Sequence, residues 1–123
     1  ILPAKWIRKL VTEYSDENNL MVCSSTTSHT KTNFDVIQAI DWLYSSSLAR
    51  GGVGLNKIVG CFGNNFSIRK STFDQLGGYR KIQFTVTEDF SLMKAVDEIE
   101  NKDANKNDNA GNIRYLCDVD ALV

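Results

Sequence analysis

The chain has 123 residues, 42% of them hydrophobic and 24% charged, which is the composition of an ordinary soluble globular domain. Its 14 basic and 15 acidic residues leave a net charge of −1 with no long run of either sign, so a nucleic-acid-binding face of clustered Lys and Arg is not expected. No apolar run approaches the roughly 18 residues that a membrane-spanning helix requires.

The termini and the cysteines indicate the setting of the chain. Residues 1–6 lack the basic and apolar regions of a signal peptide, and the sequence begins and stops within apolar patterns, so we expect a section of a longer protein. Cys23, Cys61 and Cys117 are odd in number and each lies in an apolar stretch, which predicts buried, reduced thiols in the cytoplasm. His29 has no Cys or carboxylate at ligand spacing and is interpreted as a loop residue, so neither a zinc site nor a Ser-His-Asp triad is expected.

The first predicted elements are a helix, a strand and a loop. Pro3 can open a helix, and apolar residues recur at helical spacing from Trp6 to Tyr14, so we expect a helix that ends near residues 18–19. Residues 20–24 form a short apolar run typical of a strand, and the Ser/Thr-rich residues that follow predict a loop.

A long second helix should follow this loop. Thr32 or Asn33 is a suitable N-cap, and Gly51-Gly52 is expected to end the helix. The predicted apolar face of this helix consists of Val36, Ile37, Ile40, Leu43, Tyr44 and Leu48.

Two strands and a short helix are predicted next. Residues 57–61 and 65–70 have the character of strands. Ser71 can cap a short helix, and the pair Gly77-Gly78 is expected to stop it.

The last predicted elements are a third long helix and a strand. The helix starts at Thr87 and is followed by residues 101–112, which are rich in Asn, Asp and Lys and predict a polar loop or a tolerated insertion. Alternation over residues 113–117 predicts a strand, so the whole order indicates an α/β fold in one domain, 1–123. The apolar side of the helix consists of Phe90, Leu92, Met93, Val96 and Ile99.

One stretch with residue types unusual for pure structure surrounds Gly63. Glycine permits either a positive φ or a close approach of the backbone to another group. Asn64 and Asn65 place two side-chain amides beside it, although strand interiors usually avoid asparagine. A turn that contacts a polyhydroxylated ligand fits this pattern, and so does a plain β-turn or bulge.

A second such stretch is Thr87-Glu88-Asp89, with two carboxylates in the first turn of a predicted helix. Acidic residues at this position stabilise a helix through its dipole, which is a sufficient structural reason for them. The same dipole favours the ionised carboxylate, which can accept a proton from a sugar hydroxyl within hydrogen-bonding distance.

Taken together and in this order, the two stretches resemble the inverting family-two nucleotide-sugar glycosyltransferases of the GT-A fold. That family has a glycine and a nearby asparagine, a short strand ending in two basic residues, a Gly-Gly-aromatic helix stop and a Glu-Asp pair. The Thr-Glu-Asp form is that of cellulose and hyaluronan synthases, and the resemblance covers most of residues 1–98. The matching residues are Gly63, Asn65, Arg69-Lys70, Gly77-Gly78-Tyr79 and Thr87-Glu88-Asp89.

The resemblance implies a role for each matching residue. Asp89 would be the general base that takes the proton from the acceptor hydroxyl, and Glu88 would orient the base or the acceptor. The substrate-binding residues implied are Gly63, Asn64, Asn65, Arg69, Gly77, Gly78 and Thr87, although Arg69 fits a structural ion pair equally well.

The chain departs from the family in lacking the nucleotide-binding strands and the Asp-x-Asp motif. The resemblance therefore implies that the chain is the acceptor-side, C-terminal portion of a GT-A fold, with an incomplete sheet flanked by helices. Such a fragment should be inactive alone. The unpaired edges of its sheet would favour a homodimer of the fragment. The Mg²⁺ or Mn²⁺ of the full-length enzyme would be held outside this chain, which supplies no metal ligands. The implied partners are a nucleotide sugar and a carbohydrate or lipid-linked acceptor, in the cytoplasm or at the inner face of the membrane. Membrane association through other segments, processivity and the identities of sugar, nucleotide and acceptor are left open.

Two other interpretations compete with an enzyme. A non-catalytic carbohydrate- or protein-binding module could keep the same architecture, although such a module has no need of a base like Asp89. A plain α/β structural domain would use both stretches only as turn and cap, and would place Asp89 far from Gly63.

Overall fold

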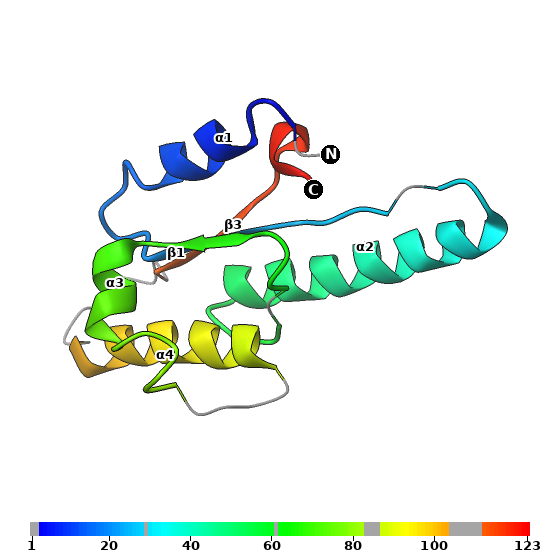
Figure 1. Ribbon diagram of the computed structural model, residues 1–123. Coiled ribbons are helices and arrows are strands. Elements are labelled where there is room, and N and C mark those ends of the chain that lie inside the picture. The colour runs from blue at the N-terminus through cyan, green and yellow to red at the C-terminus, as the bar shows by residue number, and fades with distance from the viewer. Residues whose placement is uncertain (1–2, 29, 61, 83–86, 104–111) are drawn as a thin grey trace.

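The computed structural model describes residues 3–28, 30–60, 62–82, 87–103 and 112–123, the last four residues of 87–103 by their backbone alone. Helices and strands are interspersed along the chain (Figure 1). They are α1 (Trp6–Glu13), β1 (Met21–Ser24), α2 (Asn33–Gly54), β2 (Phe66–Ile68), α3 (Lys70–Gln75), α4 (Glu88–Asp103), β3 (Ile113–Leu116) and the 3-10 turn η1 (Val119–Ala121).

The three strands form a mixed sheet in the order β2-β1-β3. The central strand β1 runs antiparallel to β2 and parallel to β3, with Cys23 opposite Phe66 on one side and Tyr115 on the other. All four residues of β1 are buried, which explains why this strand is a continuous apolar run rather than an alternating one. The described chain is thus a small mixed α/β domain.

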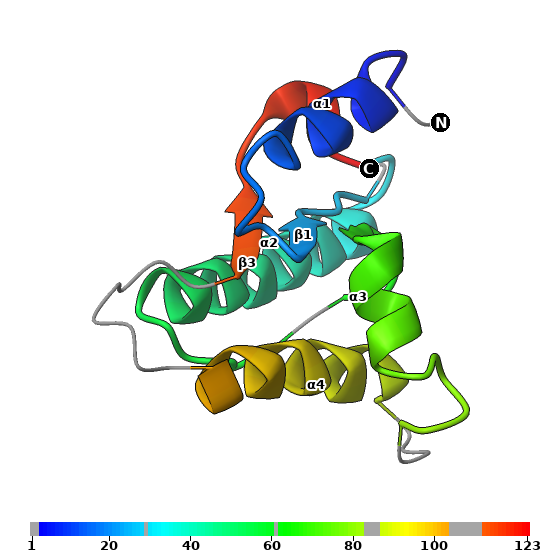
Figure 2. The same ribbon diagram turned by 90° about the vertical axis from the view of Figure 1, so that its left-hand side faces the viewer.

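Helices cover both faces of this sheet. In Figures 1 and 2, α1 and η1 lie on one side of the strands and α2 and α4 on the other. The larger core is on the α2 and α4 side, because alternate residues of β1 and β3 point there. Its buried members are Met21, Cys23, Ala49, Met93, Val96, Ile113 and Tyr115.

Ion pairs join α1 to the C-terminal turn. Lys9 Nζ lies 2.6 Å from Asp118 Oδ2, and Lys5 Nζ lies 3.5 Å from Asp120 Oδ2. The hydrogen bond from Lys9 holds the pKa of Asp118 below its ordinary value of 3.8, and Asp118 raises the pKa of Lys9 above 10.5. Both shifts favour the charged pair in the folded state.

The Lys9–Asp118 pair predicts a pH-dependent stability. Asp118 stabilises the fold above its unfolded pKa, and this contribution is lost as the pH falls through the lowered folded value. Asp118→Asn keeps an oxygen that can cap η1, so we expect it to lower the free energy of unfolding at neutral pH, by a difference that shrinks as the pH falls through the lowered pKa of Asp118. Urea unfolding at neutral pH and at a series of acidic pH values checks this. Asp74→Asn, which breaks only the exposed Lys70–Asp74 pair, should show a smaller difference at neutral pH, and equal differences for both variants would contradict the prediction.

Helix α2 begins as predicted but runs further than predicted. Thr32 and Asp35 form a reciprocal capping box, which confirms the predicted start. Gly51-Gly52 does not end the helix, which continues to Gly54. Gly52 serves close packing instead, because a Cβ there would lie 2.7 Å from the carbonyl oxygen of Lys57.

The predicted apolar face of α2 is exposed, which corrects the expectation that large apolar side chains mark the buried side. Its six residues expose between 44% and 67% of their surface. The side turned inward has smaller residues, with Ser46, Ala49 and Gly52 buried, and Trp42 contacting the ring of Phe62 at 5.2 Å. Small side chains let the helix axis approach the sheet, so packing distance decided which face is buried.

Several predicted boundaries were wrong. Helix α1 ends at Glu13 rather than near residues 18–19, and residues 57–60 form no strand. Ser71 does not cap α3, whose N-cap position is Arg69.

The remaining predictions have mixed outcomes. Helix α4 extends into the predicted polar loop as far as Asp103, and residues 104–111 lie outside the described part of the chain. Cys23 is buried as predicted, whereas Cys117 is exposed because it follows the end of β3. Cys61 and His29 lie outside the described residues.

Candidate functional site

The structure brings Gly63 and Asp89 into contact. A Cβ added to Gly63 would lie 2.5 Å from Asp89 Oδ1 and closer still to its Cγ and Oδ2, so the carboxylate rests against the glycine backbone. Positive φ is not the reason for this glycine, since the described glycines with positive φ are Gly77 and Gly78. A glycine is required at position 63 because the backbone approaches the carboxylate of Asp89 closely, 26 positions further along the chain.

This contact lies at the carboxyl edge of the two parallel strands. Because β2 runs antiparallel to β1, the turn that precedes Phe66 lies just beyond Ser24, and the backbone N–H of Ser24 donates to Asn65 O at 2.9 Å. Ligands of open α/β sheets bind at this edge. Gly63 therefore lies where the fold favours a binding site.

Helix α4 positions the carboxylates. The N–H of Ser91 donates to Thr87 O at 3.1 Å, so Thr87 immediately precedes the first turn and Glu88 and Asp89 lie within it. Thr87 and Glu88 are exposed and Asp89 is half-buried. One turn further on, Leu92 and Met93 are fully buried and anchor the helix in the core. Asp89 is thus held on a rigid element with access to solvent.

The two asparagines after Gly63 have different surroundings. Asn64, which follows Gly63 directly, is exposed, whereas Asn65 is 1% exposed. Asn65 Oδ1 accepts from Trp6 Nε1 at 3.0 Å, and its Nδ2 donates to Ser25 O at 2.6 Å and Ala121 O at 2.9 Å. These bonds join α1, the end of β1 and η1 directly beneath the site. Asn65 supports the site from below and presents no free donor to a ligand.

Arg69 lies at the other end of β2 from Gly63. Its guanidinium donates to three carbonyl oxygens, those of Tyr14, Asp16 and Asn19, at 3.1 to 3.2 Å, and lies 5.1 Å from the centroid of the Tyr14 ring. These contacts close the turn between α1 and β1. They give Arg69 a structural role that rests on carbonyl oxygens and an aromatic ring, whereas the structural alternative expected from the sequence was an ion pair.

Gly77 and Gly78 end α3 in a Schellman motif. The N–H of Gly78 donates to Phe73 O and that of Gly77 to Asp74 O, both at 3.0 Å. Both glycines have positive φ, of 79° and 64°, which explains the pair without a ligand. The motif places Tyr79 against Phe73, with ring centroids 5.4 Å apart.

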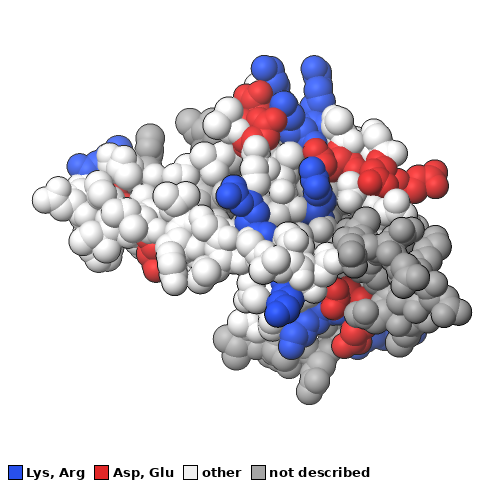
Figure 3. All heavy atoms as spheres, turned by 180° about the vertical axis from the view of Figure 1, so that it is seen from behind, with Lys and Arg blue, Asp and Glu red and all other residues white. Residues whose placement is uncertain are grey.

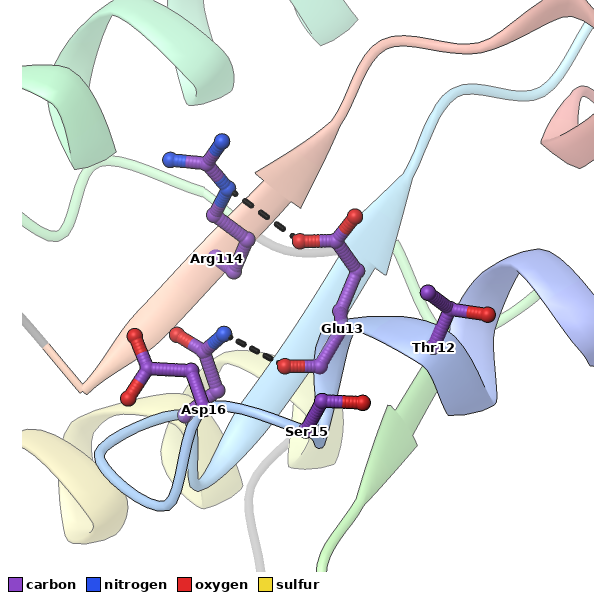
Figure 4. A pocket seen from close by; sticks show the side chains of 6 residues that line it. Thr12, Glu13, Ser15, Asp16 and Arg114 are labelled. Atoms are coloured by element: carbon purple, nitrogen blue, oxygen red, sulfur yellow. Dashed lines mark hydrogen bonds and ion pairs between the residues drawn. The ribbon is translucent and has the colours of Figure 1, made fainter.

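A polar hollow of about 370 Å³ lies at the opposite edge of the sheet, between the end of α1 and β3. Figure 4 shows Glu13 and Arg114 pointing toward one another across it, at 3.4 Å. Asn19 Nδ2 also donates there to Glu13 O at 2.7 Å. This hollow is separate from Gly63 and Asp89, and sequence analysis did not anticipate it.

Comparison with family models, curated protein sequences and solved structures finds no match for this chain. The functional assignment therefore depends on the geometry of Gly63 and Asp89. Within the described residues, no three His, Cys, Asp or Glu side chains gather as metal ligands. In the same part of the chain, no helix has both the length and the apolar character needed to cross a bilayer.

Proposed function

We propose that this chain is the acceptor side of an inverting nucleotide-sugar glycosyltransferase of the GT-A type, with Asp89 as the general base. The observation that carries the proposal is the contact between Gly63 and the Asp89 carboxylate at the carboxyl edge of β1 and β3. The structural alternative, in which the two stretches serve only as turn and cap, was expected to place Asp89 far from Gly63. The contact therefore favours an enzyme over the structural alternative.

The proposed reaction requires one proton acceptor beside the acceptor sugar. Asp89 takes the proton of the acceptor hydroxyl, whose oxygen attacks the anomeric carbon of the donor from the face opposite the leaving group. The new C–O bond forms as the bond to the nucleoside diphosphate breaks, and the diphosphate leaves with the electron pair. In this proposal Glu88 and Asn64, which are both exposed, would hydrogen-bond the hydroxyls of the acceptor.

The donor nucleotide and its Mg²⁺ or Mn²⁺ are, in this proposal, held by residues outside these 123. The described part of the chain offers no cluster of metal ligands. When bound, such an ion would neutralise the charge of the departing diphosphate. The proposed location is the cytoplasm or the inner face of the membrane, and the acceptor is a carbohydrate or a lipid-linked saccharide.

The stereochemistry of the product tests the proposed class. The full-length protein that contains this sequence would be given a panel of nucleotide sugars with Mg²⁺ or Mn²⁺ and a sugar acceptor, and the anomeric configuration of the product read by NMR. We expect an α-linked donor to give a β-linked product. A product with retained configuration would overturn the proposed mechanism, and binding of saccharide without transfer from any donor would favour the non-catalytic module.

A further inference from the structure

Helix α2 has two apolar sides, and the sheet uses only one of them. Its C-terminal half packs on the core through Ala49 and Val53, while its N-terminal half projects beyond the rest of the molecule (Figure 1). Its hydrophobic residues therefore surround the helix instead of forming a single stripe, which is typical of a helix buried on all sides. The outer side has no partner within the described part of the chain.

The outer side forms a continuous apolar surface, here called the α2 stripe. Its members recur at intervals of three or four residues, some of them as adjacent pairs, so they share one half of the helix over about four turns. Their side chains are 44% to 68% exposed. The stripe consists of Phe34, Val36, Ile37, Ile40, Leu43, Tyr44 and Leu48.

The size of the α2 stripe matches one half of a stable protein interface. Seven side chains that each present roughly 100–120 Å² amount to about 800 Å², which is the contribution of one partner to an interface of standard size. The largest apolar patch of a typical monomer is smaller, about 300–600 Å². A surface this large marks a site of association.

The charges near the α2 stripe argue against a lipid surface as its partner. From Asn33 to Ala49 the helix carries two carboxylates, Asp35 and Asp41, and no Lys or Arg. An interfacial helix gains its attraction to anionic lipid from basic residues that are missing here. Figure 3, which views the molecule from behind, shows the projecting part of α2 as a mostly uncharged surface.

We propose that the α2 stripe binds the α2 stripe of a second copy of this chain, forming a two-fold symmetric dimer. An uncharged apolar stripe on a projecting helix is complementary to itself, as a two-fold interface requires. Antiparallel packing of the two helices would place Ile40, Leu43 and Tyr44 at the centre of the interface. The inference is independent of the proposed catalytic role, because it uses no residue of the Gly63 and Asp89 site.

Sedimentation velocity of the 123-residue chain tests the proposal with a matched pair of variants. Ile40 on α2 and Ile7 on α1 are both helical isoleucines, 61% and 65% exposed, so neither substitution removes a buried side chain. We expect a wild-type dimer at micromolar concentration, a rise of at least about 100-fold in the dissociation constant for Ile40→Glu, and no rise for Ile7→Glu. Circular dichroism would verify that both variants fold.

Three outcomes would overturn the proposed dimer. One is a wild-type chain that stays monomeric up to several hundred micromolar. Another is a dimer that Ile40→Glu leaves intact, which would point to pairing of the open edges of β2 and β3. The third is a monomer that co-sediments with phosphatidylcholine vesicles and loses this binding in Ile40→Glu, which would assign the stripe to a lipid surface.

Discussion

In the proposed glycosyltransferase, replacement of Gly63 by alanine is expected to lower turnover by about 100-fold without unfolding the protein, because a displacement of about 1 Å at a reacting group costs that much. A Cβ at this position would overlap the Asp89 carboxylate, which must then rotate away from the glycine backbone. Gly63 has no positive φ, so alanine itself is compatible with the backbone. The rate constant kcat and the thermal unfolding midpoint would be measured together.

Gly51→Ala is the matched control for this prediction. A Cβ at Gly51 would meet no atom within 4 Å, and alanine within a helix is more stable than glycine by about 0.5–1 kcal/mol. Its turnover should equal that of wild type. If Gly63→Ala were as active as Gly51→Ala, the contact between Gly63 and Asp89 would have no part in catalysis.

Replacement of Asn65 by alanine is expected to lower the free energy of unfolding by about 3 kcal/mol. The change removes three hydrogen bonds from a residue that is 1% exposed. It also leaves the part-buried indole N–H of Trp6 without its acceptor, whereas Ser25 O and Ala121 O keep their second donors, Val123 N and Ser24 Oγ. Urea denaturation of the 123-residue chain at neutral pH would measure the loss.

Asn64→Ala is the control, because the neighbouring amide is exposed and its removal should change stability by no more than about 0.5 kcal/mol. Comparing the two variants distinguishes a residue that stabilises the fold from a residue that contacts the substrate. A stable Asn65→Ala variant with a raised KM for the acceptor would contradict the structural role and return Asn65 to the binding surface.

Some local signals in the sequence predicted the local structure correctly. The capping box at Thr32 and the glycine stop after α3 each involve groups within five residues of one another. Both helix ends could therefore be predicted from the residue types alone. The periodicity of Leu92, Met93 and Val96 likewise identified the buried side of α4. These features need no knowledge of distant contacts.

The buried side of α2 could not be predicted in the same way. The helix has apolar residues on both sides, and the periodicity of large side chains indicated the outer one. Burial was decided by how closely a face containing Ser46 and Ala49 can approach the sheet, and this depends on the strands rather than on the helix. Gly52 was likewise misread as a helix stop, because its contact with Lys57 O arises only once the chain turns back.

The candidate site was predicted in part. Resemblance to a family placed Gly63 and Asp89 in one site, whereas no spacing rule would bring those two residues into contact. The role of Asn65 was missed, because its partners Trp6 and Ala121 lie 59 and 56 positions away. The indole N–H of Trp6, which needs an acceptor wherever it is removed from water, was the signal available for that bond.

The central claim is that Asp89 takes the proton of the acceptor hydroxyl, and transfer by an Asp89→Asn variant of the full-length protein tests it most directly. Asp74→Asn makes the same chemical change at an exposed carboxylate of α3 and should transfer as wild type does. We expect Asp89→Asn to bind the donor nucleotide normally and to lose transfer by a factor of at least about 100. Equal transfer by Asp89→Asn and Asp74→Asn would contradict the claim and remove Asp89 from the mechanism.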